Sequence, residues 1–132
     1  MISEVKSVDI ELSVLNNEEC LKFTFKENLK ESDALEAIEE WKKLFQAAGG
    51  DKINVIWDCI EMTGFENKAR VAWQHAIKEL KKQINCVWLV TDSKMIKAGA
   101  KVMNKFISFK LKVVESVENI IISNSQLNLQ RT

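Results

Sequence analysis

The fold is decided by two apolar stretches, INVIWD at residues 53–58 and INCVWLVTD at residues 84–92. Apolar residues follow one another in both stretches, without the polar alternation of a half-exposed strand. Such short runs are typical of strands buried on both faces, as in parallel sheets. We therefore predict two central strands, which end at Asp58 and at Thr91–Asp92.

Less buried strands are expected toward the two ends of the chain. Apolar and polar residues alternate over residues 8–14 and 21–25, and residues 16–19 supply turn chemistry, which predicts an antiparallel hairpin. A last strand is expected from the alternation of Phe109, Leu111 and Val113. Residues 116–123 allow a short helix or an edge strand, and their propensity favours a strand. We expect the polar tail at residues 124–132 to be frayed.

A first amphipathic helix is expected between the hairpin and residue 53. Ser32–Asp33 should open it, with Glu36 at capping-box spacing, and Gly49–Gly50 should end it. Its apolar side follows helical spacing at Leu35, Ile38, Trp41 and Phe45.

Two further helices are expected after the central strands. A loop at residues 59–66 should lead to the second helix, capped by Asn67, and Asp92 or Ser93 should cap the third. Their apolar sides are Ala69, Trp73, Ala76, Ile77 and Leu80 in one, and Met95, Ile96, Gly99, Val102, Met103 and Phe106 in the other.

The resulting order is β-β-α-β-α-β-α-β, with a closing helix as an option. Alternating strands and helices imply parallel pairing through right-handed crossovers, so we predict an α/β fold with a mixed, mostly parallel sheet packed with helices. The 132 residues contain no repeat or linker, and residues 1–132 are expected to form a single domain.

Composition excludes several classes of protein. Hydrophobic residues make up 46% of the chain, which suits one packed core, and no apolar run is long enough to span a bilayer. The N-terminus lacks the pattern of a signal peptide, so a cytoplasmic location is expected. The three cysteines Cys20, Cys59 and Cys86 form neither a disulfide framework nor a CxxC motif.

Charge is polarised along the chain although the formal net charge is zero. Residues 1–65 hold 7 Lys/Arg and 14 Asp/Glu, a net of −7, whereas residues 66–112 hold 11 and 3, a net of +8. Residues 113–132 hold 1 and 2, a net of −1. A net charge of zero argues against a general nucleic-acid binder, but the polarity is compatible with contacts between unlike halves.

The two central strands, the helices after them, the final strand and Ser116–Asn119 together resemble the STAS domain. The resemblance is to its divergent SpoIIAA-like branch, which is also similar to lipid-binding SEC14-type domains. It implies a fold with a helix as the last element, and a relationship to bacterial anti-sigma-factor antagonists. It also implies that protein partners are met near the second and third helices.

The family's switch is a Ser or Thr that a kinase phosphorylates in a D-S-[ST]-G turn before the second helix. By this resemblance the turn should fall near residues 66–69, where the sequence has Glu-Asn-Lys-Ala and no hydroxyl. Thr63–Gly64 comes three or four residues early. Phosphorylation of Thr63 is one interpretation, and an ordinary turn residue before a glycine is the other.

A basic stripe on the third helix is the main candidate for partner binding. Lys94, Lys97, Lys101 and Lys105 recur at helical spacing, and Lys78, Lys81 and Lys82 add positive charge near the second helix. The stripe could be a solvated face. Alternatively it binds an acidic protein, a membrane surface, or the acidic half of a second copy in a homodimer or a head-to-tail assembly.

The remaining candidates are weaker. Asp58 and Asp92 at the strand ends could bind a cation or polar ligand, or simply hold a turn and cap a helix. Trp57, Trp73 and Trp88 could line a cavity for a lipid-like molecule, or pack in the core. No nucleophile–base pair, metal-ligand spacing or glycine-rich phosphate loop is present, so we predict no catalytic residue, metal or cofactor.

Overall fold

The computed structural model describes residues 7–15, 18–106 and 111–120. Its elements follow the predicted order, and the fold class is confirmed. The elements are β1 (Val8–Leu15), β2 (Glu18–Leu29), α1 (Glu31–Ala47), β3 (Ile53–Phe65), α2 (Asn67–Leu80), the 3₁₀ turn η1 (Lys81–Gln83), β4 (Ile84–Val90), α3 (Lys94–Phe106) and β5 (Leu111–Val114).

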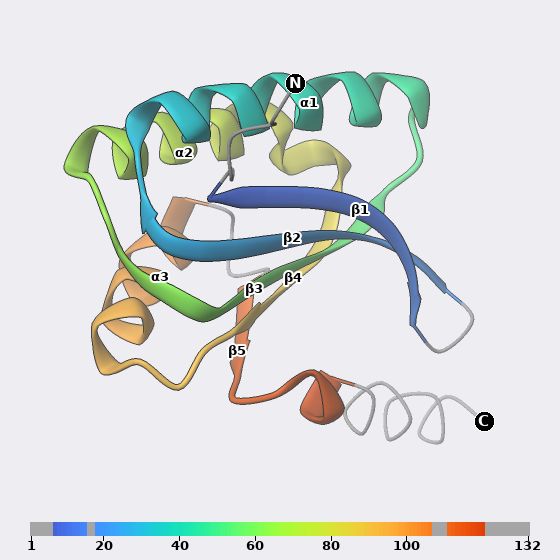
Figure 1. The fold of residues 1–132 in the computed structure, drawn as a ribbon. Helices are drawn as coiled ribbons and strands as arrows, with labels where there is room; N and C mark the ends of the chain where they lie inside the picture. Colours follow the sequence, from blue (N-terminus) through green and yellow to red (C-terminus); the bar gives the residue numbers. More distant parts are fainter. Residues whose placement is uncertain (1–6, 16–17, 107–110, 121–132) are drawn as a thin grey trace, which may run out of the picture.

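The strands form one sheet in the order β1-β2-β3-β4-β5. β1 is antiparallel to β2, and all later pairs are parallel. Each crossover therefore steps to the next strand in the same direction. Right-handed crossovers of this kind place every helix on the same face of the sheet. Figure 1 shows α1 and α2 side by side over that face, with α3 next to α2.

An aromatic cluster fills the space between the helices and the sheet. Trp41 lies at its centre, with ring centroids 5.3 Å from Phe23 and from Trp73 and 6.3 Å from Trp57. All four side chains are at most 3% exposed. Edge-to-face packing of this kind adds to the burial of large apolar area. Among the described side chains, the buried Nε1 atoms of Trp41 and Trp57 have no hydrogen-bond partner.

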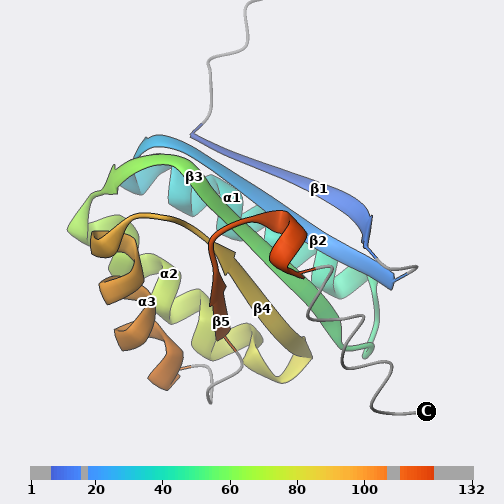
Figure 2. The same ribbon diagram turned by 90° about the horizontal axis from the view of Figure 1, so that it is seen from below.

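The opposite face of the sheet is apolar only at its centre. There Ile56, Trp88 and Val90 pack with Cys20 and with Ile120, which is completely buried. Residues 117–120 are helical and lie across this face, as seen in Figure 2. This cover explains why the two central strands lack polar alternation. The helix expected from the family resemblance is confirmed over 117–120, whereas Phe109, residues 121–123 and the tail lie outside the described residues.

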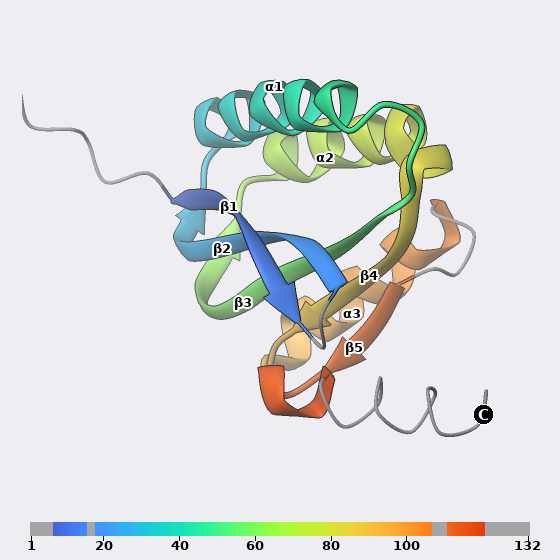
Figure 3. The ribbon, with the colours of Figure 1, turned by 90° about the vertical axis from the view of Figure 1, so that its right-hand side faces the viewer.

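The loop expected at residues 59–66 is wrong, because β3 continues as a strand to Phe65. β2 also extends to Leu29, and the two strands stay paired beyond Thr24 and Asp58. Two register shifts give β3 extra residues relative to β2, and they bend the paired strands. The curved ends are visible beside α2 in Figure 3.

Two of the expected helix caps are also wrong. α1 begins at Glu31 after Lys30, and Asp33 instead accepts a 2.6 Å hydrogen bond from the Ser7 hydroxyl. α2 begins at Asn67 after Glu66, whose carboxylate accepts a 2.7 Å hydrogen bond from the Glu31 backbone amide. Lys30 and Glu66, which precede these helices, make no side-chain capping bond to the helix that follows them. Contacts between distant segments hold both helix starts instead.

The cap of the third helix is confirmed for Ser93. Its Oγ accepts a 3.3 Å hydrogen bond from the Ile96 amide, and its carbonyl accepts one from Lys97. This is the usual way in which a serine satisfies the first free amides of a helix.

Several apolar residues that were expected in the core are exposed. Leu35 on α1 is 50% exposed, while Met95 and Val102 on α3 are 52% and 51% exposed. Small residues take the buried positions instead, because Ala34, Ala37 and Ala100 let their helices approach the core closely. Leu12 and Val14, near the end of β1, are likewise 70% and 67% exposed.

Candidate functional site

Helix α3 is a two-sided helix fixed to the core by a small number of side chains. Ile96 and Ala100 are buried in the main core cluster, and Met103 is half-buried and packs against it. Gly99 lies over Phe65, so that a Cβ at this position would meet the ring at 3.7 Å. Two further side chains of the helix make contacts within the domain, Lys97 with Glu115 and Asn104 with the Leu111 backbone amide.

The exposed side of α3 carries uncompensated positive charge. Lys94, Lys101 and Lys105 are exposed, and none of them forms an ion pair with another described residue. Lys97 differs, since its Nζ lies 3.1 Å from Glu115. The predicted stripe is thus brought together on one element, but Lys97 is already neutralised within the domain.

Two exposed apolar residues lie beside these lysines. Met95 and Val102 are seven positions apart, so they fall on the same side of the helix, each next to a lysine in sequence. We call Lys94, Met95, Lys101, Val102 and Lys105 together the α3 face. Sequence periodicity missed the two apolar members because it assigned them to the core. Ala100 was the signal that could have revealed this. A small residue allows the helix to pack closely, and the side of α3 that carries Ala100 is the side that is buried.

Lys78 and Lys82 belong to different elements. Lys78 lies in the last turn of α2 and Lys82 in η1, and both are exposed. We therefore leave them out of the α3 face.

Asp58, within strand β3, is engaged in ordinary local contacts. Asp58 Oδ1 accepts a hydrogen bond from the Ile60 amide at 3.2 Å, and Asp58 Oδ2 lies 3.9 Å from Lys22 Nζ. Asp92 is exposed and comes two residues after Val90, the last residue of β4, which pairs in register with Asp58. Among the described residues, no group of three or more His, Cys, Asp or Glu could hold a metal ion.

Thr63 and Gly64 lie in strand β3 and not in a turn. Glu27 pairs with Met62 and Asn28 with Gly64, which leaves Thr63 as the extra residue of a bulge. Its side chain is exposed. A Cβ at Gly64 would lie 3.2 Å from Asn28 Oδ1, so the glycine permits a close approach of the two strands.

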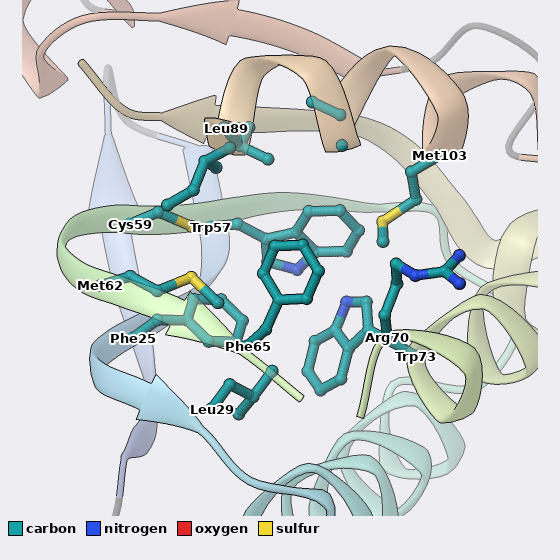
Figure 4. Close-up of a pocket in the computed structure, with 13 residues that line it drawn as sticks. Phe25, Leu29, Trp57, Cys59, Met62, Phe65, Arg70, Trp73, Leu89 and Met103 are labelled. Atoms are coloured by element: carbon teal, nitrogen blue, oxygen red, sulfur yellow. The ribbon is translucent and has the colours of Figure 1, made fainter. Parts of the chain in front are cut away.

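An apolar cavity of about 70 Å³ lies between α2, α3 and the sheet, as shown in Figure 4. Trp57 and Trp73 line it, but Trp88 belongs to the cluster on the other face of the sheet. Arg70 is the one charged residue of its lining, and its guanidinium donates to Asn67 Oδ1 at 2.7 Å. Binding pockets for small molecules usually measure roughly 300–1,000 Å³.

Cys59 and Cys86 are poor nucleophiles. Burial, and secondarily the negative charge of Asp58, raise the pKa of the Cys59 thiol to about 12. Burial also raises the pKa of Cys86. Thiolates are the reactive species, so neither thiol is activated for chemistry.

Within the described residues, no helix is both long and apolar enough to cross a membrane.

Comparisons with known proteins agree with this architecture. The family model of SpoIIAA-like proteins matches residues 20–119, and the chain belongs to this family. No curated protein matches the sequence significantly.

Two solved structures share the fold. One is an uncharacterised DUF3478 protein with a SpoIIAA-like fold from Shewanella loihica PV-4, at 16% identity and a TM-score of 0.75, covering 90% of this chain and 94% of the other. The second is the anti-sigma factor antagonist SpoIIAA in its unphosphorylated form, at 13% identity and a TM-score of 0.60, covering 89% and 98%. At these identities the likeness establishes the fold alone.

Proposed function

We propose that this member of the SpoIIAA-like family is a non-catalytic protein-interaction module that binds an acidic protein partner through the α3 face. The observation that carries the proposal is the pairing of Met95 and Val102, each about half exposed, with lysines that lack a carboxylate partner among the described residues. Burial of the apolar side chains would supply affinity, and the lysines would select for acidic partners and speed their association.

The composition of the face fits a protein partner better than a solvated surface. A lysine stripe alone is normally solvated, because exposed charges gain little from single pairs. Met95 and Val102 lie on one side of the helix among these lysines, and exposed apolar side chains have no role in solvation. A SpoIIAA-like relative that antagonises an anti-sigma factor is consistent with a role in protein binding.

Regulation by phosphorylation is not part of this proposal. Asn67 and Lys68 start helix α2 where the family places its phosphorylated hydroxyl. Thr63 lies in a paired strand, whereas kinases act on segments that can adapt to their cleft. We propose that the module binds constitutively and that Thr63 is structural.

A carrier of a hydrophobic small molecule is the alternative function. The lining of the cavity supports it, and so does the buried Trp57 Nε1, which has no partner among the described residues. The volume of about 70 Å³ counts against it, since a lipid chain would require α2 and α3 to separate. We therefore place the function on the surface of α3.

Site-specific photo-crosslinking in the native host tests the proposal. A photoreactive amino acid at Val102 should capture an acidic protein, and the reversals Lys94→Glu, Lys101→Glu and Lys105→Glu should abolish the crosslink because they remove the attraction. Lys43→Glu together with Lys68→Glu is the matched control, since both lysines are exposed on other helices. Crosslinks that persist in the α3 reversals, or are equally lost in the control, would count against the α3 face.

A further inference from the structure

A second surface of the molecule has the complementary character of the α3 face. An open groove of about 980 Å³ lies between the end of α1, the start of β3 and the β1–β2 hairpin. Its apolar members include Leu44 and Ile53, both partly buried, and Leu12, which is 70% exposed. Like Met95 and Val102, Leu12 exposes apolar area that nothing in the described structure covers.

The groove is rimmed mainly by negative charge. Glu18, Glu19 and Asp51 line it together with one cation, Lys52, and no ion pair involving these four is found among the described residues. Glu18 accepts a 2.9 Å hydrogen bond from the side-chain Nδ2 of Asn54, which orients the carboxylate without neutralising it. Part of the acidic excess of the N-terminal half therefore lies around a depression that is lined by both apolar and polar residues.

The groove and the α3 face lie at opposite ends of the molecule. In Figure 1, α3 is at the left, whereas the hairpin end and the end of α1 are at the right. In Figure 3 the hairpin end faces the viewer and α3 lies behind the sheet. The two surfaces cannot meet within one chain, but they can meet between two.

We infer that the α3 face of one copy docks into this acidic groove of a second copy, which gives head-to-tail self-association. This inference rests on the α3 face of the proposed function and names a second copy as one of its partners. An exposed helix side entering an apolar groove with opposite charge on its rim is a common mode of protein recognition. Because the two surfaces differ, the contact is heterologous, and it builds a ring or an open chain of copies but not a two-fold dimer.

Complementation between two variants tests the inference. The helix variant carries Lys101→Glu, Lys105→Glu and Val102→Ser, and the groove variant carries Leu12→Ser, Glu19→Gln and Asp51→Asn; all six positions are exposed. In sedimentation velocity at low salt, the wild type should form assemblies larger than a dimer as concentration rises. Each variant alone should be monomeric, with association weakened about tenfold or more.

The mixture gives the decisive result. An equimolar mixture should form a one-to-one dimer and nothing larger, since it contains one intact groove and one intact α3 face. Recovery of association also shows that both variants are folded; if either fails to fold by circular dichroism, Val102→Asp and Leu12→Asp replace them. A wild type that stays monomeric, or a mixture that does, overturns the inference. Capture of an acidic partner by Val102 in that case would leave the proposed function standing.

Discussion

At the scale of single residues, Cys59 links burial to the pH dependence of stability. Its pKa is raised from 9.0 to about 12, chiefly by burial and secondarily by Asp58. Between these values the unfolded chain releases the thiol proton while the folded chain retains it, so stability is complete below pH 9 and falls as pH rises toward 12. From about pH 8 to about pH 10, this thiol should cost roughly 1.4 kcal/mol of unfolding free energy.

Urea unfolding of the wild type and of Cys59→Ala measures this effect. The variant is expected to be less stable at pH 8, because it leaves a small void, and to lose about 1.4 kcal/mol less than the wild type between the two pH values. Parallel loss in both proteins would show that Cys59 does not titrate abnormally. Asp58→Asn should change the dependence only slightly, since burial is the larger cause.

At the scale of secondary-structure elements, the bulged pairing of β2 with β3 forces Glu27 into an unfavourable conformation. Its φ of 56° is the one positive value outside glycine among the described residues, and it lies where the register shifts. A left-handed conformation costs a residue with a side chain roughly 1–2 kcal/mol, whereas the cost for glycine is close to zero. Glu27→Gly should therefore raise the unfolding free energy by up to about 1 kcal/mol, after the greater entropy of unfolded glycine is deducted.

Glu61→Gly is the matched control for chemical denaturation. Glu61 is an exposed glutamate of the partner strand with a negative φ, so the same replacement should lower stability by roughly 0.5–1 kcal/mol. Equal losses in both variants would contradict strain at Glu27.

The elements that the sequence could predict are those whose signal is local. The strand at residues 84–90 and the cap at Ser93 depend on neighbouring residues and appear as expected. The strand from Cys59 to Phe65 could not be predicted in this way, because its pairing with the end of β2 is a contact between segments that are distant in the sequence. The predicted cap of α2 was wrong for the same reason, since the Glu66 side chain accepts a hydrogen bond from the backbone of α1.

At the scale of the whole molecule, charge could be read from the sequence but surface apolarity could not. The acidic N-terminal half and the lysines of α3 follow from counting residues. Whether Met95 or Ala100 faces the core depends on how closely α3 packs, and both choices satisfy helical periodicity. Trp57 and Trp88 lie on the adjacent strands β3 and β4, yet Trp88 pairs with Ile56 and thus projects from the other face.

The two faces of the sheet are covered to very different extents, and this difference makes Ile120 critical for stability. Three helices cover one face, whereas the described cover of the other is the turn at residues 117–120. Ile120 is completely buried against Ile56, Trp88 and Val90. Ile120→Ala should therefore lower the unfolding free energy by about 2–5 kcal/mol, because it removes transfer energy and leaves a void.

Val113→Ala is the control for that loss, since Val113 is an apolar residue of the nearby strand β5 but is 39% exposed. Its truncation leaves no closed cavity and should cost no more than about 1 kcal/mol in the same urea titration. Comparable small losses for both variants would mean that the turn adds little to stability, so that the central strands would tolerate water on this face. The expected difference would instead show that residues 117–120 are an integral part of the domain. The continuous apolar stretches at 53–58 and 84–92 require such a cover, because their side chains on this face would otherwise be exposed to water.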